Sequence, residues 1–74
     1  PNSARHDQWS ALSDREIQVF ALIGKGYSSQ QIAKRLHISV KTIETHRANI
    51  KQKLGISSTG DLLQSAIAYA QQAG

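Results

Sequence analysis

Residues 39–54 combine short polar side chains and cations on one face of a predicted single helix. A stripe of side chains spaced three or four positions apart marks the inner face: Val40, Ile43, Arg47, Ile50 and Leu54. At about 100° per residue, the opposite face carries Lys41, Thr45, Ala48 and Gln52, flanked by Glu44, Asn49 and Lys51. Ordinary exposed helix faces carry long charged residues throughout. The short side chains let other atoms approach closely, so we interpret this face as a recognition surface.

The positive charge of the chain is concentrated around this helix. The net charge is +4. Between residues 34 and 53, Glu44 is the only acidic residue, and the basic residues are Lys34, Arg35, Lys41, Arg47, Lys51 and Lys53. A basic segment confined to one element and its neighbour is typical of a phosphate-binding surface. The alternative is a solubilising face, because a charge of this size is ordinary for a small domain.

The 74 residues suffice for one small domain, and Cys is absent, so helix packing must supply the stability. No apolar run reaches the roughly 18 residues of a membrane span. We therefore expect a soluble cytoplasmic domain with no membrane partner. Acid and base side chains occur, but without a nucleophile motif, a glycine-rich phosphate loop or paired metal-ligand spacing. We expect no enzyme activity, no cofactor and no metal site.

Helix starts are marked by capping residues. Ser13 with Glu16, and Ser28 with Gln31, have the spacing of capping boxes. Ser39 is the expected cap of the third helix and Gly55 its C-terminal stop. For the fourth helix the cap is left open among three residues: Ser57, Ser58 and Thr59.

The sequence therefore predicts an all-α, four-helix bundle-like domain, with helices at about 14–24, 29–36, 40–54 and 59–72. Only residues 37–39 separate the second helix from the third, so these two must cross steeply as a helix-turn-helix. We assign residues 1–10 to a linker or disordered segment and 11–74 to the domain. Trp9 is the exception, since so large a ring is usually packed, either against the first helix or against an upstream domain outside this chain, and we favour the first helix.

The fourth helix has an apolar surface larger than a three-helix core can bury, and its small Ala residues allow close approach. We expect it to form a homodimer contact through Leu62, Leu63, Ala66, Ile67, Tyr69 and Ala70. The alternative is a terminal helix packed wholly on its own core.

Residues 11–72 resemble the LuxR-type helix-turn-helix domain, as found at the effector end of NarL/FixJ-class response regulators of two-component systems. The resemblance rests on fixed positions at fixed spacings, including Leu12-Ser13-x-Arg15-Glu16-Ile17, Gly26-Tyr27-Ser28-Ser29-x-x-Ile32-Ala33 and Thr42-Ile43-x-x-His46 with Lys53-Leu54-Gly55. It implies a transcription factor that binds double-stranded DNA, with the third helix in the major groove, the fourth at a dimer contact, and a receiver or sensor domain outside this chain. The family usually has Asn at Ser29 and Arg near Thr59.

The resemblance places base-facing sites at Glu44, Thr45 and Ala48, and backbone-contacting sites at Thr42 and Lys53. The Glu44 carboxylate can accept a hydrogen bond from the N4 amino group of cytosine, and the methyl group of Thr45 can pack against that of thymine. The small side chain of Ala48 leaves space for a thymine methyl or for the DNA backbone. Asn49 is a further candidate for a base edge. We expect phosphate contacts from Ser28, Ser29, Lys34, Lys41, Thr42, Lys51 and Lys53.

Several of these residues have other readings. Glu44 is also consistent with a surface contact to a neighbouring side chain, or with a charge that lowers non-specific affinity. Arg47 is consistent with a side chain whose aliphatic stem is buried and whose guanidinium meets a carboxylate such as Glu16.

A different class of function also remains open, a protein-interaction module in which the third helix docks into a partner groove. DNA binding should weaken steeply with salt, whereas an apolar protein contact should not.

Overall fold

Four helices follow directly from the caps in the sequence. The computed structural model describes residues 9–73, and in it α1 spans Asp14–Gly24, α2 Ser29–Leu36, α3 Val40–Leu54 and α4 Thr59–Ala73. Both capping boxes form, with Ser13 Oγ accepting from the Glu16 N–H and Ser28 Oγ from the Gln31 N–H. The all-α prediction is confirmed, and the predicted helix bounds differ from the observed ones only at the end of α4.

The cap of α4 is Ser58, one of the three candidates. Its Oγ accepts from the Asp61 N–H at 3.0 Å, and its carbonyl accepts from the Leu62 N–H at 3.1 Å. This bonding satisfies donors that the first turn of a helix leaves without a partner.

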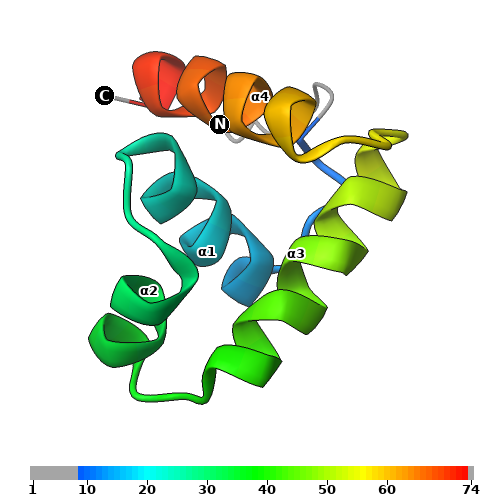
Figure 1. Ribbon diagram of the computed structural model, residues 1–74. Helices are drawn as coiled ribbons and strands as arrows, with labels where there is room; N and C mark the ends of the chain where they lie inside the picture. Colours follow the sequence, from blue (N-terminus) through cyan, green and yellow to red (C-terminus); the bar gives the residue numbers. More distant parts are fainter. Residues whose placement is uncertain (1–8, 74) are drawn as a thin grey trace.

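Helix α1 lies at the centre of the fold. It is flanked by α2 and α3, which diverge from a short turn, while α4 crosses the opposite end of the molecule (Figure 1). The core draws on every helix, and its largest fully buried side chains are Phe20, Ile32, Ile43, Ile50, Leu62 and Val19. Since α1 touches each of the other three helices, it fixes how the α2–α3 pair is oriented relative to α4.

Trp9 belongs to this core. Its ring lies 5.2 Å from that of Phe20 and 5.8 Å from that of Tyr69, and its indole N–H donates to Gln72 Oε1 at 3.2 Å. The expected packing against the first helix is confirmed and extends to α4. The rest of the predicted linker, residues 1–8, lies outside the described residues, and the boundary at residue 10 stays a prediction.

Two glycines at the end of α1 have different physical roles. Gly26 follows the end of α1 with a φ of 95°, a left-handed conformation that glycine adopts without strain. Gly24 is still helical and lies against α4, where an added Cβ would sit 2.7 Å from the Ala66 carbonyl carbon and 3.2 Å from Ala70 Cβ. The absence of a side chain at Gly24 is therefore what allows α1 and α4 to pack so closely.

Gly24→Val should destabilise the domain, because its side chain would force α1 away from the backbone of α4. Overpacking of this kind costs about 1–3 kcal/mol, or roughly 5–20 °C in Tm for a domain of this size, which thermal unfolding followed by circular dichroism would measure. Gly60→Val is the matched control, because it adds the same side chain in α4 where a Cβ meets nothing within 4 Å. Equal effects of the two changes would show that helix propensity, and not the α1–α4 approach, governs the result.

Candidate nucleic-acid interface

Helix α3 begins and ends with well-formed caps. Ser39 Oγ accepts from the Thr42 N–H at 3.1 Å, and the two hydroxyl oxygens lie 2.9 Å apart. At the other end Gly55 takes the left-handed conformation at φ 69°, and the Ile56 N–H donates to the Lys51 carbonyl at 2.8 Å. The helix is thus delimited at both ends by local hydrogen bonds.

The turn before α3 is closed by a residue in an uncommon conformation. His37 has φ 59° and ψ 42°, the left-handed region that non-glycine residues rarely occupy. The next residue, Ile38, donates its N–H to the Ala33 carbonyl at 3.1 Å, which completes the C-terminal cap of α2. These bonds define the steep change of direction between α2 and α3 that the short connection predicted (Figure 1).

The inner face of α3 is held by two isoleucines. Ile43 and Ile50 are completely buried, while Arg47 and Leu54 are half-buried. Val40 departs from the prediction, because it is 39% exposed. The buried stripe therefore begins at Ile43, one turn later than the sequence suggested.

The outer face of α3 is open to solvent along its length. All four residues predicted to read bases are exposed, as are the residues on either side of them in the helical pattern: Lys41, Glu44, Thr45, Ala48, Asn49 and Gln52. The Thr45 hydroxyl donates to the Lys41 carbonyl at 3.2 Å, a bond within the helix. A single surface of α3 therefore offers an acid, an amide and small side chains to a ligand.

Residues predicted to contact phosphate lie around this face and at the start of α2. Lys34, Lys41 and Thr42 are exposed, Lys51 is half-buried, and Ser29 is half-buried in the first turn of α2. Ser28 is exposed, with its hydroxyl used for the cap. Arg35 lies over the Tyr27 ring, with its Cζ 4.6 Å from the ring centre, so this cation is held against the surface of the domain.

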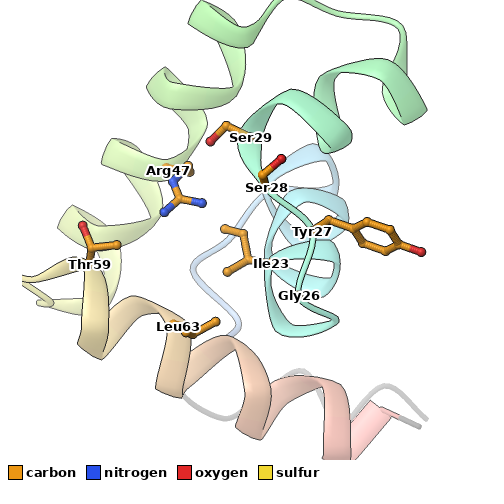
Figure 2. A pocket seen from close by; sticks show the side chains of 8 residues that line it. All are labelled: Ile23, Gly26, Tyr27, Ser28, Ser29, Arg47, Thr59 and Leu63. Carbon is orange, nitrogen blue, oxygen red and sulfur yellow. The ribbon is translucent and has the colours of Figure 1, made fainter.

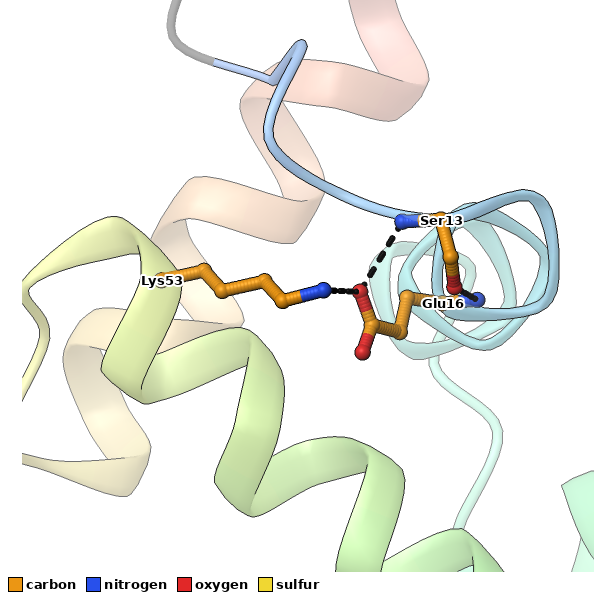
Figure 3. Close-up of polar contacts among 3 residues, drawn as sticks. All are labelled: Ser13, Glu16 and Lys53. Carbon is orange, nitrogen blue, oxygen red and sulfur yellow. Dashed lines mark hydrogen bonds and ion pairs between the residues drawn. The ribbon is translucent and has the colours of Figure 1, made fainter.

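Lys53 forms an ion pair that the sequence did not predict. Its Nζ donates to Glu16 Oε1 at 2.7 Å, and the same oxygen accepts from the Ser13 N–H at 2.9 Å (Figure 3). Glu16 is buried, and its burial alone would raise the pKa of the carboxyl. The bonds from Lys53 and Ser13 outweigh that effect and hold the pKa of Glu16 below its usual value of 4.5. The pair joins the last turn of α3 to the first turn of α1.

The expected contact between Arg47 and Glu16 is wrong, because Lys53 occupies the carboxylate. Arg47 instead lines a pocket of about 400 Å³, and its guanidinium points toward the start of α2 (Figure 2). The remaining walls come from the end of α1, the start of α2 and the start of α4: Ile23, Gly26, Tyr27, Ser28, Ser29, Thr59 and Leu63. Among residues 9–73, Arg47 forms no ion pair.

Neither a metal site nor a membrane span is indicated in the part of the chain that the structure describes. Residues 9–73 contain no group of three or more His, Cys, Asp or Glu side chains placed to bind a metal ion. Over the same residues, no helix is both long and apolar enough to cross a bilayer.

Comparison with known families assigns the fold. Residues 10–66 match the family described as bacterial regulatory proteins, luxR family, which is more than half of the chain. The chain belongs to the luxR family. This confirms the resemblance drawn from the sequence, and it makes the chain a DNA-binding helix-turn-helix domain of a kind found in bacterial transcription regulators, which are not a class of enzyme.

Two relatives of this luxR-family domain are similar over most of its length. The oxygen regulatory protein NreC of Staphylococcus carnosus (strain TM300) is 40% identical over 65 residues, which are 88% of this chain and 30% of that protein. The protein of the same name from Staphylococcus aureus (strain JH9) is 43% identical over 61 residues, 82% of this chain and 28% of that protein. The luxR-family domain thus spans less than a third of the length of these curated relatives.

The fold of the luxR-family domain buries some of the residues predicted for a dimer contact and leaves others at the surface. Leu62 and Ala66 are completely buried in its own core, and Tyr69 contacts the rings of Trp9 and Phe20. Leu63 is 42% exposed, and Ile67 and Ala70 are half-buried. Leu62 and Ala66 therefore have no surface to offer to a partner, because they fill the space against α1 that the sequence pattern alone did not reveal.

The Glu16–Lys53 pair predicts how the stability of the luxR-family domain depends on pH. Because the folded-state pKa of Glu16 lies below 4.5, its contribution is present above that pH and is lost as pH falls through the folded-state value. Glu16→Gln should keep the cap but lose the charge, and so should lower Tm at pH 7 with a penalty that shrinks in acid. A penalty that stays constant between pH 7 and acid would contradict this account.

Proposed function

We propose that this domain binds double-stranded DNA in a sequence-specific manner, with α3 in the major groove. The observation that carries the proposal is that one face of α3 is buried in the core of a luxR-family domain while the opposite face is exposed to solvent. Ile43 and Ile50 are buried, while the face that bears Glu44, Thr45 and Ala48 is open. A helix held on one side only, with acid, amide and methyl groups on the other, suits the width and the edge chemistry of the major groove.

The proposed contacts divide into positioning and reading. Lysines beside the reading face, together with the hydroxyls of Ser28, Ser29 and Thr42, would bind phosphates and fix the orientation of the domain without choosing a sequence. Lys34 and Lys41 support this role by their exposure. Lys53 would have to exchange Glu16 for a phosphate, so we rank it below the other lysines.

The whole protein to which this domain belongs is proposed to be a transcription regulator of the two-component type, acting in the bacterial cytoplasm where its DNA is. The support is the family and the similarity to the proteins named oxygen regulatory protein NreC, which are about three times as long as the chain. A receiver or sensor domain would then lie outside the residues of this chain.

We also propose that two copies pair on DNA through α4, now centred on Leu63 and Ile67. Leu63 is the one large apolar side chain of α4 that is exposed in the described residues, and Ile67 follows one turn later on the same side. A two-fold pair of helix-turn-helix domains should cover a pseudo-palindrome with half-sites about 10 base pairs apart.

The direct test is selection of bound duplexes from a random-sequence pool at two salt concentrations. We expect an enriched motif with two-fold symmetry, and retention that falls with salt at a slope of about −0.9 per phosphate neutralised. Lys41→Ala should reduce the slope by about one and leave the motif unchanged. Lys25→Ala, which removes the same charge at the exposed C-terminal cap of α1, is the control and should leave both the slope and the motif unchanged.

Each result has a distinct meaning. An enriched motif without two-fold symmetry would reject pairing on DNA and keep the DNA-binding function. Retention that does not depend on salt, or no retention of any sequence, would reject the DNA-binding proposal in favour of a protein-interaction module.

A further inference from the structure

Three exposed side chains form a continuous patch at the middle of the outer face of α3. Glu44 and Thr45 are adjacent in the sequence, and Ala48 lies one helical turn after both of them, at the i+4 and i+3 positions. Such positions place side chains about 5–6 Å apart on a helix surface. We call Glu44, Thr45 and Ala48 the reading triplet.

The structure commits the hydroxyl group of Thr45 to the helix itself. Its Oγ1 donates to the Lys41 carbonyl at 3.2 Å, so the single hydroxyl proton is already used. Thr45 can therefore meet a ligand with its methyl group or with a lone pair of Oγ1, but not with a donor, and Ala48 offers a second methyl one turn later. A slot between two methyl groups accepts another apolar group and gives nothing to a hydrogen-bond acceptor.

Glu44 adds the only charged group of the triplet, and it is an acceptor. The carboxylate is exposed and, within residues 9–73, forms no ion pair with the lysines around it. An ionised carboxylate accepts hydrogen bonds and donates none. The reading triplet therefore contains acceptors and two methyl groups, but no available donor.

This combination matches pyrimidines and disfavours purines. In the major groove guanine shows two acceptors, and adenine shows an acceptor beside its amino group, so both place a lone pair where Glu44 would repel it. Cytosine shows the N4 amino donor and thymine the C5 methyl, with only the O4 acceptor beside it. Each group of the triplet has its complement on a pyrimidine.

We propose that the reading triplet reads two neighbouring pyrimidines on one DNA strand, a cytosine through Glu44 and the C5 methyl of a thymine through the slot between Thr45 and Ala48. This inference rests on the proposed function and deepens it by naming the base chemistry of the site. It makes binding depend on the thymine methyl, a group that no phosphate contact or hydrogen bond senses.

The test replaces thymine with deoxyuridine, which differs only by the missing methyl. The probe is the duplex enriched by the random-sequence selection described above, with each thymine of a half-site replaced in turn and the Kd measured for the 74-residue chain. One position should weaken binding about fourfold, the effect of failing to bury one methyl group, and the remaining positions should have little effect.

A matched pair of variants separates the methyl from the hydroxyl. Thr45→Val keeps a methyl in the slot and should retain the preference for thymine over deoxyuridine at that position. Thr45→Ser keeps the hydroxyl and its bond to the Lys41 carbonyl, and should bind the two duplexes equally. Circular dichroism checks that both variants fold, which is expected because Thr45 is exposed.

Three outcomes would overturn the inference. An enriched half-site without adjacent cytosine and thymine on one strand would contradict it, and so would selective binding that no deoxyuridine weakens. A Thr45→Ser variant that prefers thymine as strongly as the unaltered chain would show that the Thr45 methyl does not sense the base. In each case sequence-selective, salt-sensitive binding would persist and the proposed function would stand, whereas loss of all DNA binding by the unaltered chain would remove both.

Discussion

The burial of one narrow stripe of α3 is the constraint on which the rest of the structure depends. Ile43 and Ile50 lie two turns apart, are fully buried, and hold the helix against the core at two points along its length. A helix fixed in this way cannot roll about its axis without exposing both side chains, at a cost of about 1.5–3 kcal/mol for each. The opposite face is therefore presented to solvent in a fixed orientation, which is what a surface that reads a ligand needs.

Electrostatic interactions secure the same helix near its end and leave its reading face free. The Lys53 ammonium group is held by the buried Glu16 carboxylate, which is itself part of the capping box of α1. Removing the Lys53 charge would leave the buried Glu16 carboxylate without its ion pair. This should cost more than removing the Glu16 charge, which would leave unpaired only a lysine that is 40% exposed. One pair thus links the start of α1 to the end of α3, and Lys41 stays exposed on the outer face of α3.

The parts of the fold that depend on neighbours in the sequence could be predicted from the sequence. Ser13 and Ser28 with their partners three residues later, and Gly55 after the last turn of α3, define helix ends by short-range bonds that the residue types announce. The exposed outer face of α3 was predicted for the same reason, because helical periodicity alone separates it from Ile43 and Ile50.

The predictions that failed depend on distances between helices. Spacing along the chain could not show that Lys53, and not Arg47, reaches Glu16, since both are cations in the second half of α3 and the choice depends on where α1 lies. Nor could it show that Leu62 and Ala66 are buried within the domain. Their burial depends on the close approach of α4 to α1, which is possible because Gly24 has no side chain. The roles of individual residues in binding DNA remain predictions, since they concern a partner that the chain does not contain.

The most direct test of the account is to map backbone amide chemical shifts of the chain during titration with the duplex obtained by selection. The account predicts that the largest changes fall on the outer face of α3, at residues 41, 44, 45, 48, 49 and 52, and at the start of α2, with smaller changes on α4 around Leu63 and Ile67, where two copies pair. Changes confined to α4 or to the walls of the Arg47 pocket, with α3 unaffected, would contradict the claim that α3 is the surface that meets DNA.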